Sequence, residues 1–490
     1  SSDVYKRQVS AGDQIQTTKK KSPGKSEMTS EIEYTGYLSP DVLKSLPVAT
    51  TVGNHDADNA NYTYHFNTPN SSDLGSNGVV GGDYYFTYGN TLFMMLNTQD
   101  TNAAEHKQFM EQAIAANPNC TWRVVTLHQD IYGSAEHSNE PEITNLRYTL
   151  VPYFEANDVD VVLTGHDHAY SRTHILEGGH KTVEYTDDEF DAKLDKDMDA
   201  GENPATRYEA PANISADSKE PADVAYLNYL NAVMDKDAIE DTEKGETVVN
   251  PDGILYMTAN SSSGSKYYDL VPRMQSYIAN RWQEDVPTYS VIDVTDNTFT
   301  INTYRTDNDQ KIDETFTIKK GVTEDIKSAS VGNVKNQIYT GKQIQPAIKV
   351  TLNGKTLKAG KDYTVTYTDN KNTGLAKATI NGIGKYTGTQ TVTFKIVPKK
   401  AVLKTVKAGK SGTATVTIGK AGGKVSGYAI QVSTDSSFKK VTTYRTAKTT
   451  YTLKNLSKGK TYYVRVKAFT KVSDKNVYGA ASKTIKVKAK

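Results

Sequence analysis

Residues 163–173 read LTGHDHAYSRT and follow directly on the apolar run VDVV at residues 159–162. Two histidines, His166 and His168, therefore leave one glycine turn at the end of a predicted buried strand. The chain has only nine histidines in 490 residues, and one short turn brings these two imidazoles too close together for ordinary packing. The stretch predicts a strand whose carboxyl end carries a ligand-binding site.

Residues 9–320 alternate short apolar runs with amphipathic stretches, which is typical of an α/β domain. Two stretches, 103–117 and 143–157, have apolar residues at the i, i+3, i+4 spacing of helices. The predicted strands end in four polar islands: Gly-Asp at 12–13, Gly-Asn-His-Asp at 53–56, His128, and Gly-His-Asp-His at 165–168. Because α/β sheets place their sites at the carboxyl ends of strands, we expect the four islands to meet.

The four islands contain the residue types that bind metal ions. Carboxylate, amide and imidazole groups together suit borderline or hard ions such as zinc, manganese and iron. The single cysteine, Cys120, lies in none of the islands, so a thiolate zinc site is not expected. Each island alone is weak evidence, since a Gly-Asp pair is commonly a turn and a lone histidine is commonly a core residue. The four in this order predict a site for two metal ions.

The order Gly-Asp, Gly-Asn-His-Asp, His, Gly-His-x-His resembles the calcineurin-like metallophosphoesterase superfamily, and GHDHAYSR at 165–172 resembles its purple-acid-phosphatase-like members. The resemblance covers residues 9–320. It implies an αββα sandwich that hydrolyses a phosphate ester at two ions of zinc, manganese or iron. The implied metal ligands are Asp13 bridging both ions, Asn54, His128 and His166 on the second ion, and His168 on the first.

The same resemblance implies roles for residues beside the metals. His55 would donate a proton to the leaving-group oxygen, a task that suits an imidazole, and Asp56 would orient that imidazole. His137 would contact the phosphate, although an exposed loop histidine is an equal alternative. Tyr170 and Arg172 would support the loop rather than contact the substrate.

Two departures from the family pattern affect these expectations. Residues 1–8, SSDVYKRQ, resemble an adaptor scar, and no Asp-x-His motif, which supplies two ligands to the family's first ion, precedes Asp13. We therefore expect an N-terminally truncated domain without its first strand, and a weakly active or inactive chain. Gln16 stands where purple acid phosphatases have a tyrosine, so no tyrosinate–iron colour is expected.

The C-terminal part alternates Thr, Val and Tyr strands with Gly and Asn turns, which predicts two small all-β sandwich domains. Residues 322–398 contain YTG twice and the hairpin-like VTLNGKTL, and resemble bacterial immunoglobulin-like repeats. Residues 400–490 contain LSKGKTYYVRVKAF, in which Leu456 and Tyr462 resemble the tyrosine corner of fibronectin type III domains.

The net charge of +1 conceals two segments of opposite sign. Residues 181–250 contain 19 acidic residues against 7 basic ones, and residues 401–490 contain 20 basic residues against 2 acidic ones. The acidic insert is either a lid over the site or a solvated segment on the surface, and we favour the solvated segment. The negative charge of the insert disfavours nucleic acid as a substrate. The basic module favours attachment to an anionic cell-envelope polymer, with a charge bias for solubility as an equal alternative.

These patterns together predict a secreted or envelope-associated bacterial phosphoesterase, most like an acid phosphatase acting on phosphate monoesters. No apolar run approaches the roughly 20 residues that span a membrane, so no span is predicted. A phosphodiesterase or nucleotidase would share the metal core and is the nearest alternative. A catalytically dead envelope-binding protein is the alternative from another class.

Overall fold

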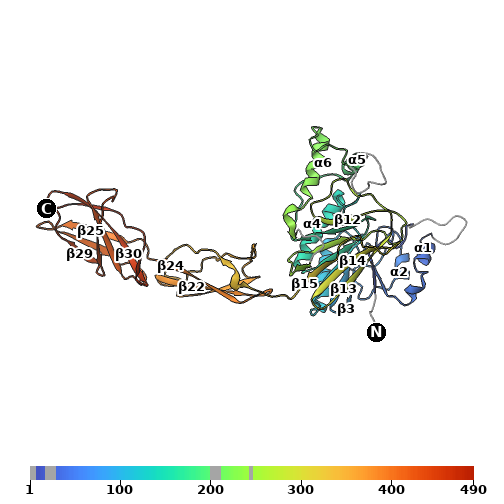
Figure 1. Ribbon diagram of the computed structural model, residues 1–490, viewed down its shortest axis with the longest axis horizontal. Helices are drawn as coiled ribbons and strands as arrows, with labels where there is room; N and C mark the ends of the chain where they lie inside the picture. The colour runs from blue at the N-terminus through green and yellow to red at the C-terminus, as the bar shows by residue number, and fades with distance from the viewer. Residues whose placement is uncertain (1–6, 17–28, 199–210, 242–246) are drawn as a thin grey trace. The chain divides into compact units, whose positions relative to one another are not determined.

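The computed structural model describes residues 7–16, 29–198, 211–241 and 247–490. The chain forms two compact units, Ser1–Gly321 and Val322–Lys490 (Figure 1). All four polar islands lie in the first unit, which combines helices and strands, whereas the second is built from strands.

The first unit is built on a seven-stranded mixed sheet with the order β12-β7-β11-β6-β5-β4-β3. The central strands β4, β5, β6 and β11 run parallel, and β3, β7 and β12 pair antiparallel on either side. Buried on both faces, the parallel strands read as unbroken apolar runs. The strands are β3 Tyr84–Tyr88, β4 Thr91–Met95, β5 Trp122–Thr126, β6 Val161–Thr164, β7 Tyr170–Thr173, β11 Leu255–Thr258 and β12 Ile278–Trp282.

A second, four-stranded sheet packs on the first and completes a sandwich. Its order is β10-β15-β14-β13, with β10 Thr247–Val249, β13 Thr288–Val294, β14 Thr298–Arg305 and β15 Phe316–Lys319. Alternate residues of β14, Phe299 and Ile301, are buried and face Trp122, Val124 and Leu163 of the larger sheet. This period-two alternation is what a sheet with one buried face requires. The expected sandwich of two sheets is confirmed.

Helices α3 (Ala103–Ala116) and α4 (Pro141–Ala156) cover the other face of the large sheet. Their apolar side chains, among them Phe109, Leu150 and Phe154, pack on the sheet core. Both helices lie where the i, i+3, i+4 spacing predicts them. Proline at the first position of α4 suits a helix start, since that residue needs no intrahelical N–H donor.

The first two strands, β1 (Gln8–Ser10) and β2 (Val48–Thr50), form a separate parallel pair. Among the described residues no ladder joins this pair to the seven-stranded sheet. Helix α1 (Thr29–Tyr37), the 3-10 turn η1 (Asp41–Lys44) and helix α2 (Asn61–His65) lie between or after these strands. Tyr34 and Tyr62 from the two helices share a small core with the residues that follow β2.

The acidic insert builds its own small core, so the expectation of a solvated segment is wrong in this respect. It contains α5 (Asp187–Met198), α6 (Pro221–Ala232), η3 (Lys236–Ala238) and β9 (Ile239–Asp241), which pairs with β8 (Ile175–Leu176) (Figure 1). The buried side chains include Phe190, Tyr226 and Tyr229, and Tyr148 of α4 packs against them. The insert is thus anchored on α4.

The second unit contains two β-sandwich modules. The first has the sheets β18-β24-β22-β21 and β17-β19-β20 and the pair β16-β23, around a core that includes Val350, Ile380 and Phe394. Its elements are β16 Glu324–Asp325, η4 Ile326–Ser328, β17 Ser330–Val331, β18 Gln337–Ile338, β19 Val350–Leu352, β20 Lys355–Thr356, β21 Tyr363–Thr368, β22 Gly374–Gly382, β23 Tyr386–Thr387 and β24 Thr389–Val397.

The second module packs the sheet β25-β26-β29 on the sheet β28-β27-β30-β31, with β32 on β30, around Val416, Ile430 and Val464. The hydroxyl of Tyr462 accepts a hydrogen bond from the Ser457 backbone N–H at 2.9 Å. The strands are β25 Val402–Ala408, β26 Ala414–Gly419, β27 Gly427–Ser433, β28 Thr442–Thr446, β29 Thr450–Leu453, β30 Thr461–Val472, β31 Lys475–Tyr478 and β32 Ile485–Lys488. In the described part of the chain, no helix is both long and apolar enough to cross a membrane.

Candidate metal centre

Four loops that follow parallel strands meet at one point of the first unit. β1 and β2 run parallel, so the loops that carry Asp13 and Asn54 leave this pair side by side. β5 and β6 also run parallel, which places His128 and His166 at one edge of the large sheet. The Gly165 N–H donates to the His128 carbonyl at 2.9 Å and fixes these two loops together.

Two glycines allow the loops to approach this closely. Gly12 has φ +97°, and a Cβ there would lie 2.3 Å from Nδ1 of His128. A Cβ on Gly53 would lie 2.0 Å from Oδ1 of Asp13. Asp13 and His166 themselves have φ +50° and +68°. Residues other than glycine are uncommon in this region and are held there by their surroundings, so both backbones are fixed in one orientation.

His128 lies at the centre of the cluster and is buried. Its Nδ1–H donates to the carbonyl of Ala11 at 2.7 Å, which directs Nε2 into the cluster. Nε2 lies 3.2 Å from Oδ2 of Asp13, 2.9 Å from Oδ1 of Asn54 and 3.2 Å from Nδ1 of His166. Atoms with lone pairs therefore converge from four loops on one small volume.

The donor set fits a metal cation. The candidate ligand atoms of Asp13, His128 and His166 all lie within 4.8 Å of one another, and the amide oxygen of Asn54 joins them. Burial alone would raise the pKa of Asp13, but the adjacent His128 outweighs burial and holds the pKa at about 2, so the carboxylate is ionised. Burial lowers the pKa of His166, which favours the neutral imidazole that can donate a lone pair. Carboxylate, amide and imidazole ligands of this kind suit zinc, manganese or iron.

His55 and Asp56 follow Asn54 and point in different directions. The His55 N–H donates to Oδ1 of Asp13 at 3.0 Å, and its Nε2 lies 4.0 Å from Oδ2 of the same carboxylate, with the side chain 33% exposed. Asp56 instead is buried and accepts hydrogen bonds from the Gly53 N–H at 3.0 Å and the Tyr34 hydroxyl at 2.9 Å. The expectation that Asp56 orients the His55 imidazole is therefore replaced: the carboxylate holds the turn. Burial and the nearby charge of Asp13 raise the pKa of Asp56 to about 7.

His168 stands apart from the four-ligand cluster. Its Nδ1–H donates to the carbonyl of Lys266 at 3.0 Å, so Nε2 is the atom left for a metal ion. Its ring lies 5.1 Å from the ring of Tyr268, and burial lowers the pKa of the imidazole. Of the predicted ligands, His168 remains for a second ion, and the carboxylate of Asp13 would bridge to that ion as well.

His137 lies beside the cluster rather than in a free loop. Its ring centroid is 5.0 Å from that of His166 and 4.8 Å from that of Tyr268. Burial would lower the pKa of His137, but its bond to Glu140 and the charge of Asp167 raise it to about 9. Glu140 and Asp167 therefore favour the charged form of this imidazole next to the metal ligands.

Tyr170 and Arg172 support the loop from the sheet side. Both are buried and both donate to the carboxylate of Asp313, the Tyr170 hydroxyl at 2.7 Å and Nε of Arg172 at 2.6 Å. Asp313 and Tyr268 are site residues that sequence reasoning missed. Each lies far along the chain in a stretch without a motif, so no local signal identifies it.

Comparisons with known proteins identify two parts of the chain. Residues 9–170 match the family model described as calcineurin-like phosphoesterase, and residues 403–484 match the fibronectin type III domain. Two uncharacterized proteins of Mycobacterium tuberculosis, from two strains, are each 26% identical over 173 residues. The match covers 30% of this chain and 32% of theirs, so the chain spans about a third of the length of these curated relatives.

Solved structures are similar to each part. A purple acid phosphatase from yellow lupin seeds is 13% identical with a TM-score of 0.37, over 64% of this chain and 54% of the lupin chain. The sixth fibronectin type III domain of human fibronectin type III domain containing protein 3 is 22% identical with a TM-score of 0.16, over 19% of this chain and 85% of that domain.

Proposed function

We propose that this chain, which carries a calcineurin-like phosphoesterase domain and a C-terminal fibronectin type III domain, is a metal-dependent phosphoesterase that hydrolyses phosphate monoesters. One observation carries the proposal. Nε2 of His128 is surrounded by Oδ2 of Asp13, Oδ1 of Asn54 and Nδ1 of His166 at 2.9 to 3.2 Å. Such a concentration of lone pairs is stabilised by a cation at its centre.

The residues around the cluster supply the remaining functions. Bound metal ions would activate water and neutralise phosphate oxygens. His55 lies next to Asp13 with a partly exposed imidazole, so it can meet the leaving-group oxygen and donate a proton to it. The His137 ring lies 5.0 Å from the ring of His166 and 4.8 Å from that of Tyr268, so it borders the metal site, where it would bind a phosphate oxygen.

The ligand count gives the two ions different affinities. Asp13, Asn54, His128 and His166 form one complete set, and we propose that this site binds an ion tightly. Asp13 and His168 contribute two ligands to a second ion, which would bind weakly. Hydrolysis would therefore be slow and would increase with added metal.

The test compares p-nitrophenyl phosphate with bis-p-nitrophenyl phosphate in the presence of zinc, manganese or iron. We expect hydrolysis of the monoester, which Asn54→Ala should slow strongly, His55→Gln only slightly because p-nitrophenolate leaves without a proton, and His180→Gln not at all; His180 is an exposed histidine of the same unit. Faster hydrolysis of the bis-ester would favour a phosphodiesterase. Absence of both activities at every metal would overturn the enzymatic proposal and favour a binding protein.

We also propose that the protein acts outside the cell and that residues 401–490 hold it on an anionic envelope polymer. The support is charge: this module carries 20 basic residues against 2 acidic ones, and lysines such as Lys404, Lys407 and Lys440 are exposed. The full chain should sediment with a polyglycerol-phosphate polymer at low salt and be released at high salt. Absence of binding at low salt would leave the charge as a solubility feature.

A further inference from the structure

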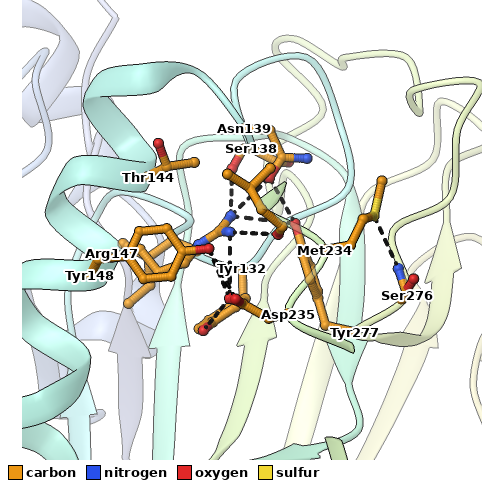
Figure 2. A network of polar contacts seen from close by, with 12 residues as sticks. Tyr132, Ser138, Asn139, Thr144, Arg147, Tyr148, Met234, Asp235, Ser276 and Tyr277 are labelled. Carbon is orange, nitrogen blue, oxygen red and sulfur yellow. Dashed lines mark hydrogen bonds and ion pairs between the residues drawn. The ribbon is translucent and has the colours of Figure 1, made fainter. Parts of the chain in front are cut away.

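Arg147 of α4 is a buried arginine whose guanidinium bonds to segments far apart in the sequence. Nη2 donates to the Ser138 carbonyl at 3.1 Å and to Oδ1 of Asn139 at 2.9 Å (Figure 2). Nε donates to the Ile131 carbonyl. Nη1 donates to the Val233 carbonyl at 3.1 Å, and Val233 belongs to the acidic insert. One guanidinium therefore ties both ends of the segment after β5 to the insert.

The insert also provides the counter-charge for this arginine. Oδ2 of Asp235 lies 3.9 Å from Nη1 of Arg147, and both side chains are almost completely buried. The hydroxyls of Tyr132 and Tyr148 donate to the same carboxylate, Tyr132 at 2.9 Å and Tyr148 at 3.0 Å (Figure 2). Removing one partner of a buried ion pair leaves the other charge uncompensated, so Arg147 depends on Asp235.

The segment held in this way carries His137. It is also held by Asp167, whose carboxylate accepts the His137 N–H at 3.0 Å and the Ala135 N–H at 2.9 Å. Asp167 lies between His166 and His168 in residues 165–168, here called the metal loop, whereas Arg147 bonds to the insert. The segment that carries His137 is thus bonded both to the loop of the metal ligands and, through Arg147, to the insert.

We propose that Asp235 and Arg147 are positioning residues through which the acidic insert sets His137 against the phosphate of the substrate. The proposal rests on the phosphate-binding role proposed for His137. Neither residue touches the substrate; they fix the loop that does. The acidic charge of the insert would repel a phosphate ester, so the contribution of the insert to the site is the geometry of this loop.

Two substitutions test the proposal, each with a matched control. Asp235→Asn keeps an acceptor for both tyrosines and removes the charge, and Asp237→Asn makes the same change at an exposed residue two positions away. Tyr148→Phe removes one donor to Asp235. Tyr153→Phe makes the same change on the same helix, at a tyrosine whose hydroxyl does not bond to Asp235 or Arg147.

We expect Asp235→Asn to raise KM for p-nitrophenyl phosphate about tenfold, with a smaller change in kcat, because a loop displaced by about 1 Å binds phosphate poorly. The effect should disappear in the His137→Ala background, since both changes act on the same contact. An equal increase of KM in the His137→Ala background would overturn the proposal.

Hydrogen exchange of residues 131–139 provides a second readout that does not depend on activity. Asp235→Asn and Tyr148→Phe should increase exchange in this segment, and the two controls should not. Unchanged exchange would overturn the positioning role even in an active enzyme. If the wild type hydrolyses no ester but exchange responds as expected, the proposed activity fails and the structural link between the insert and the His137 loop stands.

Discussion

Arg172 and Asp313 form a two-point ion pair in the interior of the first unit. Nε lies 2.6 Å from Oδ2 and Nη2 lies 3.2 Å from Oδ1, and both side chains are at most 4% exposed. Arg172 is on β7, directly after the metal loop, and Asp313 precedes β15 of the second sheet. The Tyr170 hydroxyl and the Asn280 amide also donate to this carboxylate. The pair therefore joins the metal loop to both sheets.

Replacing Asp313 with asparagine should lower the free energy of unfolding by about 3–5 kcal/mol, because the guanidinium of Arg172 would stay buried without its counter-charge. Both tryptophans of the chain, Trp122 and Trp282, lie in this unit, so their fluorescence during urea unfolding reports on it alone. Asp293→Asn, on the exposed face of β13, should change the value by less than about 0.5 kcal/mol. Equal effects of the two substitutions would contradict the role of the pair.

The same carboxylate predicts a pH dependence of stability. Burial would raise the pKa of Asp313, but the hydrogen bond and charge of Arg172 outweigh it and lower the pKa. A lowered folded-state pKa gives a stabilisation that is complete above the unfolded value of about 3.9 and is lost as the pH falls through the folded value. The difference in unfolding free energy between wild type and Asp313→Asn should therefore be constant from about pH 7 to about pH 5 and shrink below about pH 4. If the difference in unfolding free energy instead grew below about pH 4, the pKa of Asp313 would be raised, not lowered, in the folded chain.

The four islands and the layers of the fold follow from local pattern. Unbroken apolar runs predict the parallel strands, because both faces of these strands are buried. The i, i+3, i+4 spacing predicts α3 and α4, because one face of each helix is buried. The carboxyl ends of parallel strands lie at one edge, so Asp13, Asn54, His128 and His166 meet as expected.

Long-range partners do not follow from local pattern. Asp313 and Tyr268 lie in loops where neither period nor motif marks them, and only the folded chain places them at the site. The direction of Asp56 was missed for a related reason, since adjacency to His55 does not determine which way a turn points its side chains. The insert was misjudged because its acidic composition concealed the apolar residues Phe190 and Tyr229 of its core.

Gly12→Ala should weaken metal binding by about 10- to 100-fold, because the new methyl group would occupy space beside Nδ1 of His128 and displace the ring from its bond to Ala11. The measurement is calorimetric titration with zinc or manganese. Gly78→Ala is the matched control: Gly78 also has positive φ, at +75°, but a Cβ there would meet no atom within 4 Å. Equal losses of metal affinity in the two variants would show that the loss in Gly12→Ala does not come from contact of the new methyl group with His128.

Chelation should destabilise the wild type but not Asp13→Asn. An ion that binds only the folded chain stabilises it by about 2.7 kcal/mol when its free concentration is about 100 times Kd. Adding EDTA should remove this increment and lower Tm in the wild type and in Asp41→Asn, whose side chain is exposed. Because Asp13 is common to both proposed ions, its amide variant should show no response to EDTA. A full response in Asp13→Asn would exclude this carboxylate as a ligand.

His55→Gln tests the proton donor through the leaving group. A protonated imidazole contributes most when the departing oxygen is a strongly basic alkoxide and least when it is p-nitrophenolate, which leaves without a proton. The substitution should therefore reduce hydrolysis of an alkyl phosphate by about 10²- to 10⁴-fold and hydrolysis of p-nitrophenyl phosphate far less. Asn54→Ala, which removes a metal ligand, should instead slow both substrates to a similar extent. An equal loss on both substrates in His55→Gln would assign His55 to phosphate binding, and the proton would then have to reach the leaving group from another residue or from water.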